Sequence, residues 1–205
     1  MFYDDVQYDK HGWRNRNRVK TAAGPRWLTI PVSSKGNVSE GLMLADARIA
    51  WAQDWARKHA ATLRQSYGRA PFFAAYAPLV DAFYAMRPER LVDFTIETTL
   101  QLAKALGITG TRFVRSSELG VAGTRTERLV RILEAVGATS YLSGPSAKDY
   151  IDDAVFAEAR IGLDYIVYDY PAYEQLHPPY DPQVSVLDLL FMTGPEAPRY
   201  IWGAA

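Results

Sequence analysis

The stretch Thr139-Ser-Tyr-Leu-Ser-Gly-Pro-Ser-Ala-Lys-Asp-Tyr150 runs from a short apolar segment through small residues into a helical pattern. We expect a strand over 139–142, a helix over 146–160 and a further strand over 165–168. Towards the N-terminus, the same rhythm predicts a strand over 112–115 and a helix over 124–136. Strands that alternate with helices are typical of βαβ units. The sequence therefore predicts an α/β fold with an open, mainly parallel sheet.

The first half of the chain has a different rhythm. Residues 2–8 favour a short strand, and two extended stretches, 13–20 and 27–32, flank a Gly24-Pro25 turn signal, which indicates an N-terminal β-hairpin. Apolar residues at helical spacing then predict three helices, over about 46–67, 71–86 and 88–107. We expect residues of about 44–107 to be a helical insertion in a single domain that spans residues 1–205, since this length suits one core.

Charge and composition exclude several classes of function. The chain has 23 basic and 23 acidic residues and no cysteine. A neutral molecule is not expected to bind nucleic acid over a large surface, and the lack of cysteine excludes disulfides, a thiolate nucleophile and cysteine-based zinc sites. We see no signal peptide, no apolar run of the roughly 18 residues that a membrane span needs, and no histidine spacing typical of a metal site. A soluble cytoplasmic protein without a metal is expected.

The densest chemical signal is Trp13-Arg-Asn-Arg-Asn-Arg-Val-Lys20. Side chains alternate between the two faces of a strand, so one face would carry a cation ladder and the other the remaining side chains. The cation ladder comprises Arg14, Arg16, Arg18 and Lys20; the other face would carry Trp13, Asn15, Asn17 and Val19. Aligned cations repel one another unless acids or a bound anion lie opposite, and the planar guanidinium suits phosphate. Acids such as Asp4, Asp5 or Asp9 could equally neutralise them.

A second candidate is the loop Ser143-Gly144-Pro145-Ser146, which is expected to lead into a helix. Free N–H groups at a helix N-terminus can hold a phosphate or carboxylate, and Lys148 could assist. Ser116 and Ser117 follow the preceding expected strand and would lie at the same sheet end, where ligands bind open parallel sheets. We expect the loops and the cation ladder to converge on one pocket. The alternative is an ordinary capped connection.

Candidate catalytic groups are few. His11 precedes the cation ladder and could act as a general acid or base, although exposure in a loop is equally compatible with the sequence. Asp5 is the other candidate base. Asp4 and Asp5 are adjacent, so at most one readily faces a crevice. The candidate ligand-binding residues are Trp13, Arg14, Asn15, Arg16, Asn17, Arg18, Lys20, Ser116, Ser117, Ser143, Gly144, Ser146, Lys148 and Tyr150, of which Trp13 and Tyr150 could stack on a sugar or base.

Several separated motifs resemble the WbqC-like family, in the expected order over nearly the whole chain. They are Asp4-Asp-Val-Gln-Tyr8, Trp13-Arg-Asn-Arg-Asn-Arg-Val-Lys-Thr21, Trp27-Leu-Thr-Ile-Pro-Val32, Tyr141-Leu-Ser-Gly144, Ala147-Lys-Asp-Tyr150, and Ser185-Val-Leu-Asp-Leu-Leu190 with the later Gly194. Family members usually begin with a further strand and a His-Gln-Pro-Asn-Tyr-Leu-Pro-Trp loop, so the resemblance implies an N-terminally shortened member. By analogy with folds of that style, it also implies a Rossmann-like sheet.

The resemblance carries an expectation of function. Members of the family occur in gene clusters for O-antigen and other surface polysaccharides, and a glycine-transferase role has been proposed. The resemblance therefore implies a transferase of surface-polysaccharide or activated-sugar biosynthesis that moves a glycyl or other acyl group onto an amino sugar. The alternative is a non-catalytic protein that binds a nucleotide or nucleotide-sugar. Either implies a small anionic ligand; no further cofactor is identified, and the oligomeric state stays open.

Overall fold

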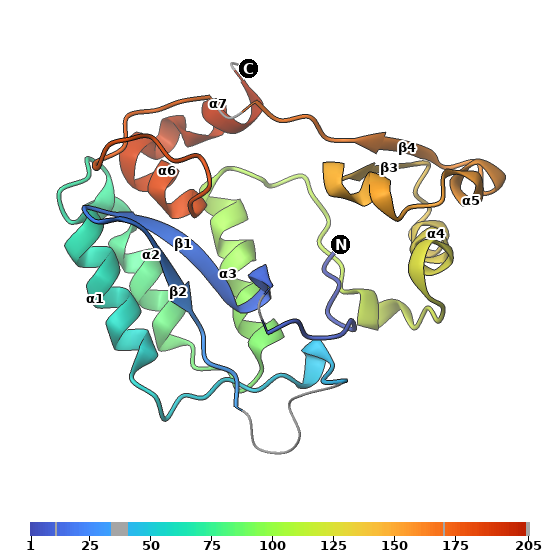
Figure 1. The fold of residues 1–205 in the computed structure, drawn as a ribbon, viewed down its shortest axis with the longest axis horizontal. Helices are drawn as coiled ribbons and strands as arrows, with labels where there is room; N and C mark the ends of the chain where they lie inside the picture. The colour runs from blue at the N-terminus through green and yellow to red at the C-terminus, as the bar shows by residue number, and fades with distance from the viewer. Residues whose placement is uncertain (11, 34–40, 170, 204–205) are drawn as a thin grey trace. The chain divides into compact units, whose positions relative to one another are not determined.

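The computed structural model describes residues 1–10, 12–33, 41–169 and 171–203. The chain divides into two compact units (Figure 1). Unit 1 comprises Met1–Asp5 and Arg112–Asp169, and unit 2 comprises Val6–Thr111 and Tyr170–Ala205. Each unit has its own core and is described by itself below.

Unit 2 contains the N-terminal hairpin that the sequence predicts. Strand β1 (Arg16–Thr21) pairs antiparallel with β2 (Gly24–Thr29). Thr21 pairs with Gly24, so Ala22 and Ala23 form the turn instead of the Gly24-Pro25 pair. Gly24 enters β2 with φ of 101°, a backbone conformation that favours glycine, and the Thr21 hydroxyl donates a 2.7 Å hydrogen bond to its carbonyl. The segment before β1 is a short 3-10 helix, η1 (Trp13–Asn15), and not strand.

The helices of unit 2 follow the apolar spacing of the sequence. Gly68 ends the first long helix, and Gly107, with φ of 76°, follows the third, so the glycine stop signals hold. The first helix is shorter than expected, because a 3-10 turn and a bend precede it. The helices are η2 (Leu44–Asp46), α1 (Trp55–Tyr67), α2 (Phe73–Ala85), α3 (Leu91–Ala105), α6 (Val186–Thr193), η5 (Gly194–Glu196) and α7 (Ala197–Trp202).

The core of unit 2 joins the hairpin to the helices. Val19 of β1 packs in one buried cluster with Leu63 and Tyr67 of α1 and Phe191 of α6. The hairpin lies over the helices of this unit (Figure 1). Burying these side chains gives each roughly 1.5–3 kcal/mol relative to exposure. Val19 of β1 and Leu28 of β2 therefore anchor the hairpin on the helices.

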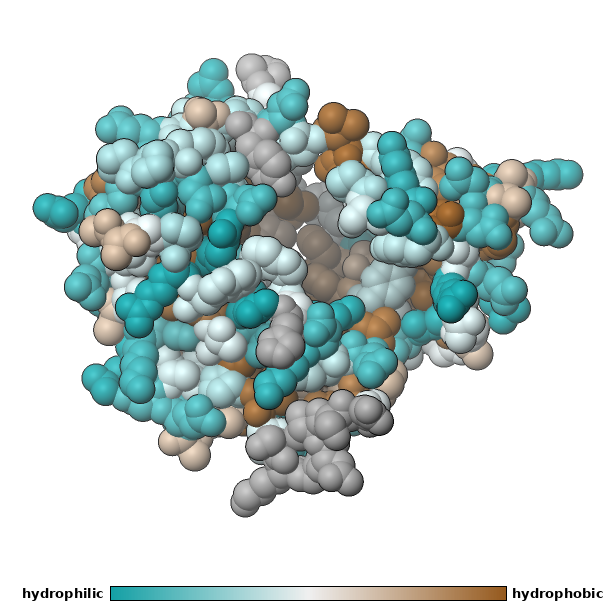
Figure 2. Space-filling model, in the orientation of Figure 1, coloured by the Kyte–Doolittle hydropathy of each residue, from teal (hydrophilic) through white to brown (hydrophobic). Residues whose placement is uncertain are grey.

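Unit 1 is smaller and is built around a short parallel pair. Strand β3 (Ser140–Ser143) pairs with β4 (Gly162–Tyr165) in parallel, with Ser140 opposite Gly162. The other elements are η3 (Ser116–Leu119), α4 (Arg125–Ala135), η4 (Pro145–Asp149) and α5 (Asp153–Glu158). One buried cluster of its core comprises Val130, Leu133, Phe156 and Ile161. Figure 2 shows that the visible faces of both units are mostly hydrophilic, with scattered hydrophobic side chains.

The expected Rossmann-like, mainly parallel sheet is wrong. The named strands of the described residues form two sheets of two strands each, one antiparallel and one parallel. The expected strand over 112–115 makes a single bridge, between Arg115 and Phe2, because the chain turns into η3 at Ser116. The Ser117 N–H then donates to the Asp4 carboxylate and not to a neighbouring strand. Among the described residues, β3 and β4 are the strands that form a parallel ladder.

The helix expected over 146–160 is also wrong. The chain forms η4, a 3-10 helix of five residues, and then α5 of six residues, with the break at Tyr150–Asp152. Asp152 caps α5 by accepting the Ala154 N–H at 3.0 Å, and a capping residue in the middle of a stretch interrupts the helix. The last strand lies at 162–165, earlier than the expected 165–168.

Three further points concern the expected organisation. Helices α1 and α2 share a buried cluster with the hairpin and α6. The single domain over 1–205, with residues of about 44–107 inserted, stays a prediction. In the part of the chain that the structure describes, no helix is both long and apolar enough to cross a membrane.

Candidate functional site

Two tryptophans and an arginine form an exposed cluster on the hairpin. The ring centroids of Trp13 and Trp27 lie 4.8 Å apart. Trp13 is 62% exposed and Trp27 is 40% exposed. The Arg16 guanidinium lies over the Trp27 ring at 4.3 Å. We call Trp13, Arg16 and Trp27 the Trp–Arg surface. An exposed aromatic face beside a cation can stack against a sugar or base and attract an anion, so this surface has the chemistry of a ligand site.

The register of the hairpin creates the Trp–Arg surface. Because the turn falls at Ala22 and Ala23, Trp27 pairs with Arg18 across the two strands. Arg18 also lies over the Trp27 ring, at 5.8 Å, so Arg16 and Arg18 share one face, as alternation predicts. Trp13 was expected on the opposite face. It lies beside Trp27 because η1, not a strand, carries it, and Arg14 is exposed in the same turn.

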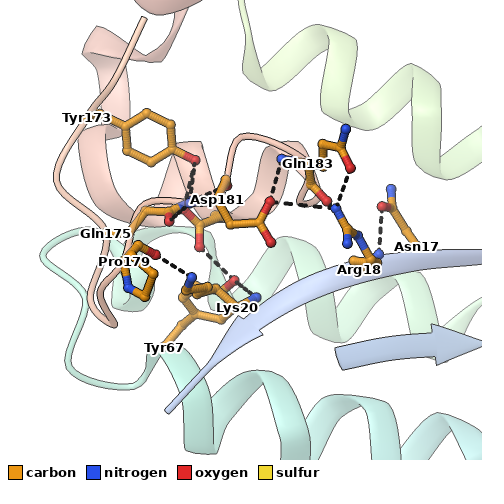
Figure 3. Close-up of polar contacts among 10 residues, drawn as sticks. Asn17, Arg18, Lys20, Tyr67, Tyr173, Gln175, Pro179, Asp181 and Gln183 are labelled. Atoms are coloured by element: carbon orange, nitrogen blue, oxygen red, sulfur yellow. Dashed lines mark hydrogen bonds and ion pairs between the residues drawn. The ribbon is translucent and has the colours of Figure 1, made fainter. Parts of the chain in front are cut away.

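The other end of the cation ladder is covered. We call residues 171–185 the Pro/Tyr segment. Lys20 is 3% exposed, and its ammonium group donates to the Pro179 carbonyl at 2.5 Å. Arg18 donates to the Gln183 carbonyl at 2.8 Å and to the Gln183 side-chain oxygen at 3.0 Å (Figure 3). Part of the cation ladder therefore binds the protein itself.

A buried carboxylate lies beneath this contact. Asp188, in the first turn of α6, is fully buried and accepts hydrogen bonds from the hydroxyls of Tyr67 (2.8 Å) and Tyr173 (2.7 Å), and from the Gln175 amide (3.1 Å). Desolvation raises the pKa of Asp188, while the three donors and the nearby Lys20 charge oppose that rise. The network closes around Asp188, so this carboxylate serves the fold and is not open to a ligand.

The two asparagines differ in role. Asn15 is 4% exposed, and its amide donates to the Ile30 carbonyl at 2.9 Å, which fixes η1 against the end of β2. Its buried Oδ1 has no hydrogen-bond donor among the described residues. Asn17 is exposed and accepts the N–H of Arg18 at 2.8 Å. These contacts shape the backbone on which the Trp–Arg surface sits.

In unit 1, the candidate base Asp5 lies in an ion pair. Its carboxylate contacts Arg128 of α4 and the Ser116 hydroxyl, both at 2.5 Å. Neighbouring Asp4 is buried and accepts the Ser117 N–H at 3.0 Å and the Ser117 hydroxyl at 2.7 Å. The Arg128 hydrogen bond, above all, holds the pKa of Asp5 below its usual value. A carboxylate held in this way is a weak base.

The Ser143 loop lacks the helix on which its anion-binding role rested. Ser143 is buried, while Ser146, Lys148 and Tyr150 are exposed. Gly144 precedes the 3-10 helix η4, which gives no macrodipole comparable to that of a long helix. The Lys148 ammonium lies 5.0 Å from the centre of the Tyr165 ring, within reach of a cation–π contact. The argument from a helix N-terminus is therefore wrong, and ligand binding here stays a prediction.

The candidate residues fall in both units, and each unit is considered by itself. Asp5, Ser116 and Ser117 lie together in unit 1, and the residues from Trp13 to Lys20 lie together in unit 2. One pocket shared by the cation ladder and the Ser143 loop would join the two units and stays a prediction. His11 lies outside the described residues. Among those that the structure does describe, no group of three or more His, Cys, Asp or Glu residues could hold a metal ion.

Comparison with known proteins decides the family. The model of the WbqC-like protein family matches residues 1–200. This chain belongs to the WbqC-like protein family. The WbqC-like protein is 38% identical over 203 residues to "Uncharacterized protein Rv1507c" of Mycobacterium tuberculosis (strain ATCC 25618 / H37Rv), a match that covers 98% of this chain and 86% of that relative. No solved structure matches the chain.

Two residues that shape these groups, Trp27 and Arg128, were not identified from the sequence of the WbqC-like protein. Trp27 was taken only as the start of a strand, although a turn at Ala22-Ala23 would have placed it opposite Arg18. Arg128 lies in the middle of a helix, where an arginine gives no signal of its long-range partner, Asp5. Asp188, which was named from the sequence only as part of the motif Ser185-Val-Leu-Asp-Leu-Leu190, is the centre of the buried network.

Proposed function

We propose that this WbqC-like protein binds a nucleotide-sugar or a similar anionic activated sugar on the Trp–Arg surface. The observation that carries the proposal is the position of Arg16 over the half-exposed ring of Trp27, with Trp13 beside it. This arrangement offers a flat ring face and a cation within one small area. A base or sugar ring can stack there while its phosphate meets the guanidinium.

The magnitudes suit a small metabolite. Stacking of a base on an aromatic side chain contributes about 1–3 kcal/mol, and a hydrogen bond to a charged group about 1.5–3 kcal/mol. Association also costs translational and rotational freedom, so only the surplus appears as affinity. The two contributions sum to at most about 6 kcal/mol before that cost, so we expect weak binding, with a Kd in the millimolar range. Such a value is still within the range of KM values for substrates.

The proposed activity is that of a cytoplasmic transferase in surface-polysaccharide or activated-sugar biosynthesis. The transferred group would be glycyl or another acyl group, and the acceptor an amino sugar. Membership of the WbqC-like family supports this part of the proposal. A single observation favours the second candidate, a non-catalytic binding protein: Asp5, one of the two candidate bases, is engaged by Arg128 and Ser116.

Binding is tested by titration calorimetry with UDP-N-acetylglucosamine, supported by thermal shifts, since a ligand of the native state raises the melting temperature. We expect binding by the wild type and at least a fivefold loss in Trp27→Ala. Trp202→Ala removes another exposed tryptophan, on α7, and serves as the matched control. Equal affinity of the wild type and both variants would remove the Trp–Arg surface from the proposal. Strong, steeply salt-dependent binding of an oligonucleotide would point to nucleic acid instead.

The two candidate functions are separated by turnover. Bound nucleotide-sugar is incubated with an amino-sugar acceptor and an activated glycyl donor, and the products are resolved by mass spectrometry. New product that disappears in His11→Ala or Asp5→Asn, with the variants still folded and still binding, supports the transferase. Retained binding without product under every donor supports the binding protein.

A further inference from the structure

The three strand cations of the cation ladder are held in three different ways. Lys20 is 3% exposed and bound to the Pro179 carbonyl. Arg16, at the opposite end, lies over Trp27. Arg18, between them, donates to Gln183 and forms an ion pair with Asp181, with 3.6 Å between Nη2 and Oδ1. Arg18 therefore contacts both the Pro/Tyr segment and the Trp27 ring.

The ion pair of Arg18 with Asp181 is the loosest of these contacts. Its 3.6 Å separation exceeds the roughly 2.7–2.9 Å of a charge-assisted hydrogen bond. About a fifth of each side chain, 19% and 20%, is exposed to solvent. The same Asp181 oxygen accepts the Gln183 N–H at 2.8 Å, a bond that needs no negative charge. Figure 3 shows the Asp181 carboxylate directed towards the guanidinium.

We propose that Asp181 is an internal anion that occupies Arg18 until a ligand with two linked phosphates replaces it. This inference rests on the proposed function, and it narrows the ligand to the diphosphate class. Arg16 and Arg18 are two residues apart on β1, which separates their Cα atoms by about 6.5–7 Å. Their long side chains can each take one phosphate of a diphosphate. A monophosphate at Arg16 leaves the ion pair of Arg18 with Asp181 in place.

Asp181 would thus determine specificity by competition. A second phosphate has to displace a carboxylate before it gains Arg18, and like charges close together disfavour the bound state. Asp181→Asn removes the negative charge and keeps the side-chain oxygen that accepts the Gln183 N–H. Asp181→Asn therefore tests the competing negative charge alone, because the turn at 181–183 keeps its hydrogen bond.

The test is calorimetric titration of the wild type and Asp181→Asn with uridine diphosphate and, separately, uridine monophosphate at low salt. We expect Asp181→Asn to bind the diphosphate about three- to tenfold more tightly, as loss of a competing ion pair of roughly 1 kcal/mol implies. The affinity for the monophosphate stays unchanged. Asp81→Asn is the matched control, because Asp81 pairs with Arg64 at 2.5 Å on the helices, and it removes the same charge elsewhere in unit 2.

Each outcome decides something. A diphosphate that binds the wild type and Asp181→Asn equally overturns the inference and leaves the proposed function standing. An equal gain for the monophosphate, or the same gain in Asp81→Asn, shows a general charge effect and also overturns it. If neither nucleotide binds the wild type or Asp181→Asn, the proposed function falls, and the inference with it. The melting temperature of each variant confirms that the fold is retained.

Discussion

The hydroxyl of Tyr67 joins Asp188 to the hairpin: it donates to Asp188 Oδ2 at 2.8 Å and accepts the N–H of Lys20 at 2.7 Å. Both Tyr67 and Asp188 are fully buried. Burial, and then the neighbouring carboxylate, raises the pKa of Tyr67, so the hydroxyl stays protonated and remains a donor at any ordinary pH. One atom thereby ties α1, β1 and α6 together.

Tyr67→Phe is expected to destabilise the protein. The change leaves the Lys20 N–H without its acceptor and removes one donor from a buried carboxylate, which costs about 1–3 kcal/mol for each unsatisfied group. The melting temperature should fall by roughly 2–4 °C per kcal/mol for a chain of this size. Calorimetry measures the shift. Tyr150→Phe is the control, since Tyr150 is 72% exposed and should change nothing; equal shifts would contradict the role of the buried hydroxyl.

The stability of the protein should decrease with acidification through His59. Burial lowers the pKa of this imidazole to about 4, although a hydrogen bond to the Thr29 backbone opposes the shift. The unfolded chain, with a histidine pKa of about 6.5, binds more protons between these values, so His59 stabilises the fold above pH 6.5 and loses that contribution as the pH falls towards 4. The loss is on the order of 3 kcal/mol.

Urea unfolding of the wild type and His59→Gln between pH 7 and pH 4.5 measures this effect. Glutamine does not titrate in this range and retains a side-chain donor. The free energy of unfolding should decrease less steeply in His59→Gln than in the wild type. Parallel curves would mean that His59 titrates normally in the folded protein.

Asp5 and Arg128 should be coupled energetically. The ion pair lowers the pKa of Asp5, so its contribution to stability is present above the carboxyl pKa of the unfolded chain and is lost as the pH falls through the lowered folded value. The pair is partly exposed, at 27% and 16%, so we expect a coupling of only about 1 kcal/mol. Denaturant unfolding of Asp5→Asn, Arg128→Met and the double variant gives the coupling. Additive effects would contradict it.

Gly194→Ala should be more harmful than Gly24→Ala. Both glycines have positive φ, 55° and 101°, so both substitutions strain the backbone. A Cβ at Gly194 would also lie within van der Waals overlap of the Phe72 ring, whereas a Cβ at Gly24 meets nothing within 4 Å. Overpacking of this kind adds about 1–3 kcal/mol. Melting temperatures of the two variants make the comparison, and a smaller loss at Gly194 would show that the Phe72 ring moves aside easily.

Local features of this fold were predictable from sequence. The hairpin and the long helices depend on residues close together in the chain, such as the apolar repeat that leads to Gly68 or the glycine at 107. The alternation of Arg16 and Arg18 on one face follows from strand geometry alone. The WbqC-like motifs were recognisable for a similar reason, since each is a short contiguous run.

Features that depend on distant residues were not predictable. The parallel sheet failed because Ser116 and Ser117 turn towards Asp4 and Asp5, more than a hundred positions away in the chain, instead of extending a strand. The Trp–Arg surface depends on the register of the hairpin, and a turn placed at Gly24-Pro25 instead of Ala22-Ala23 hides the pairing of Trp27 with Arg18. Neither the turn at Ser116-Ser117 nor the register of the hairpin can be read from the composition or the periodicity of the sequence.

The contact of Arg18 with Gln183 spans 165 positions of the chain. A ribosome that adds about 5–20 residues per second releases β1 many seconds before the Pro/Tyr segment exists. During that interval the side chains of Lys20 and Arg18 lack the carbonyl groups that later accept their hydrogen bonds. The backbone N–H of Lys20 has to wait for the hydroxyl of Tyr67, which accepts its hydrogen bond. The hairpin of the nascent chain therefore stays hydrated and loosely held, and it reaches its final form only after the Pro/Tyr segment has been synthesised.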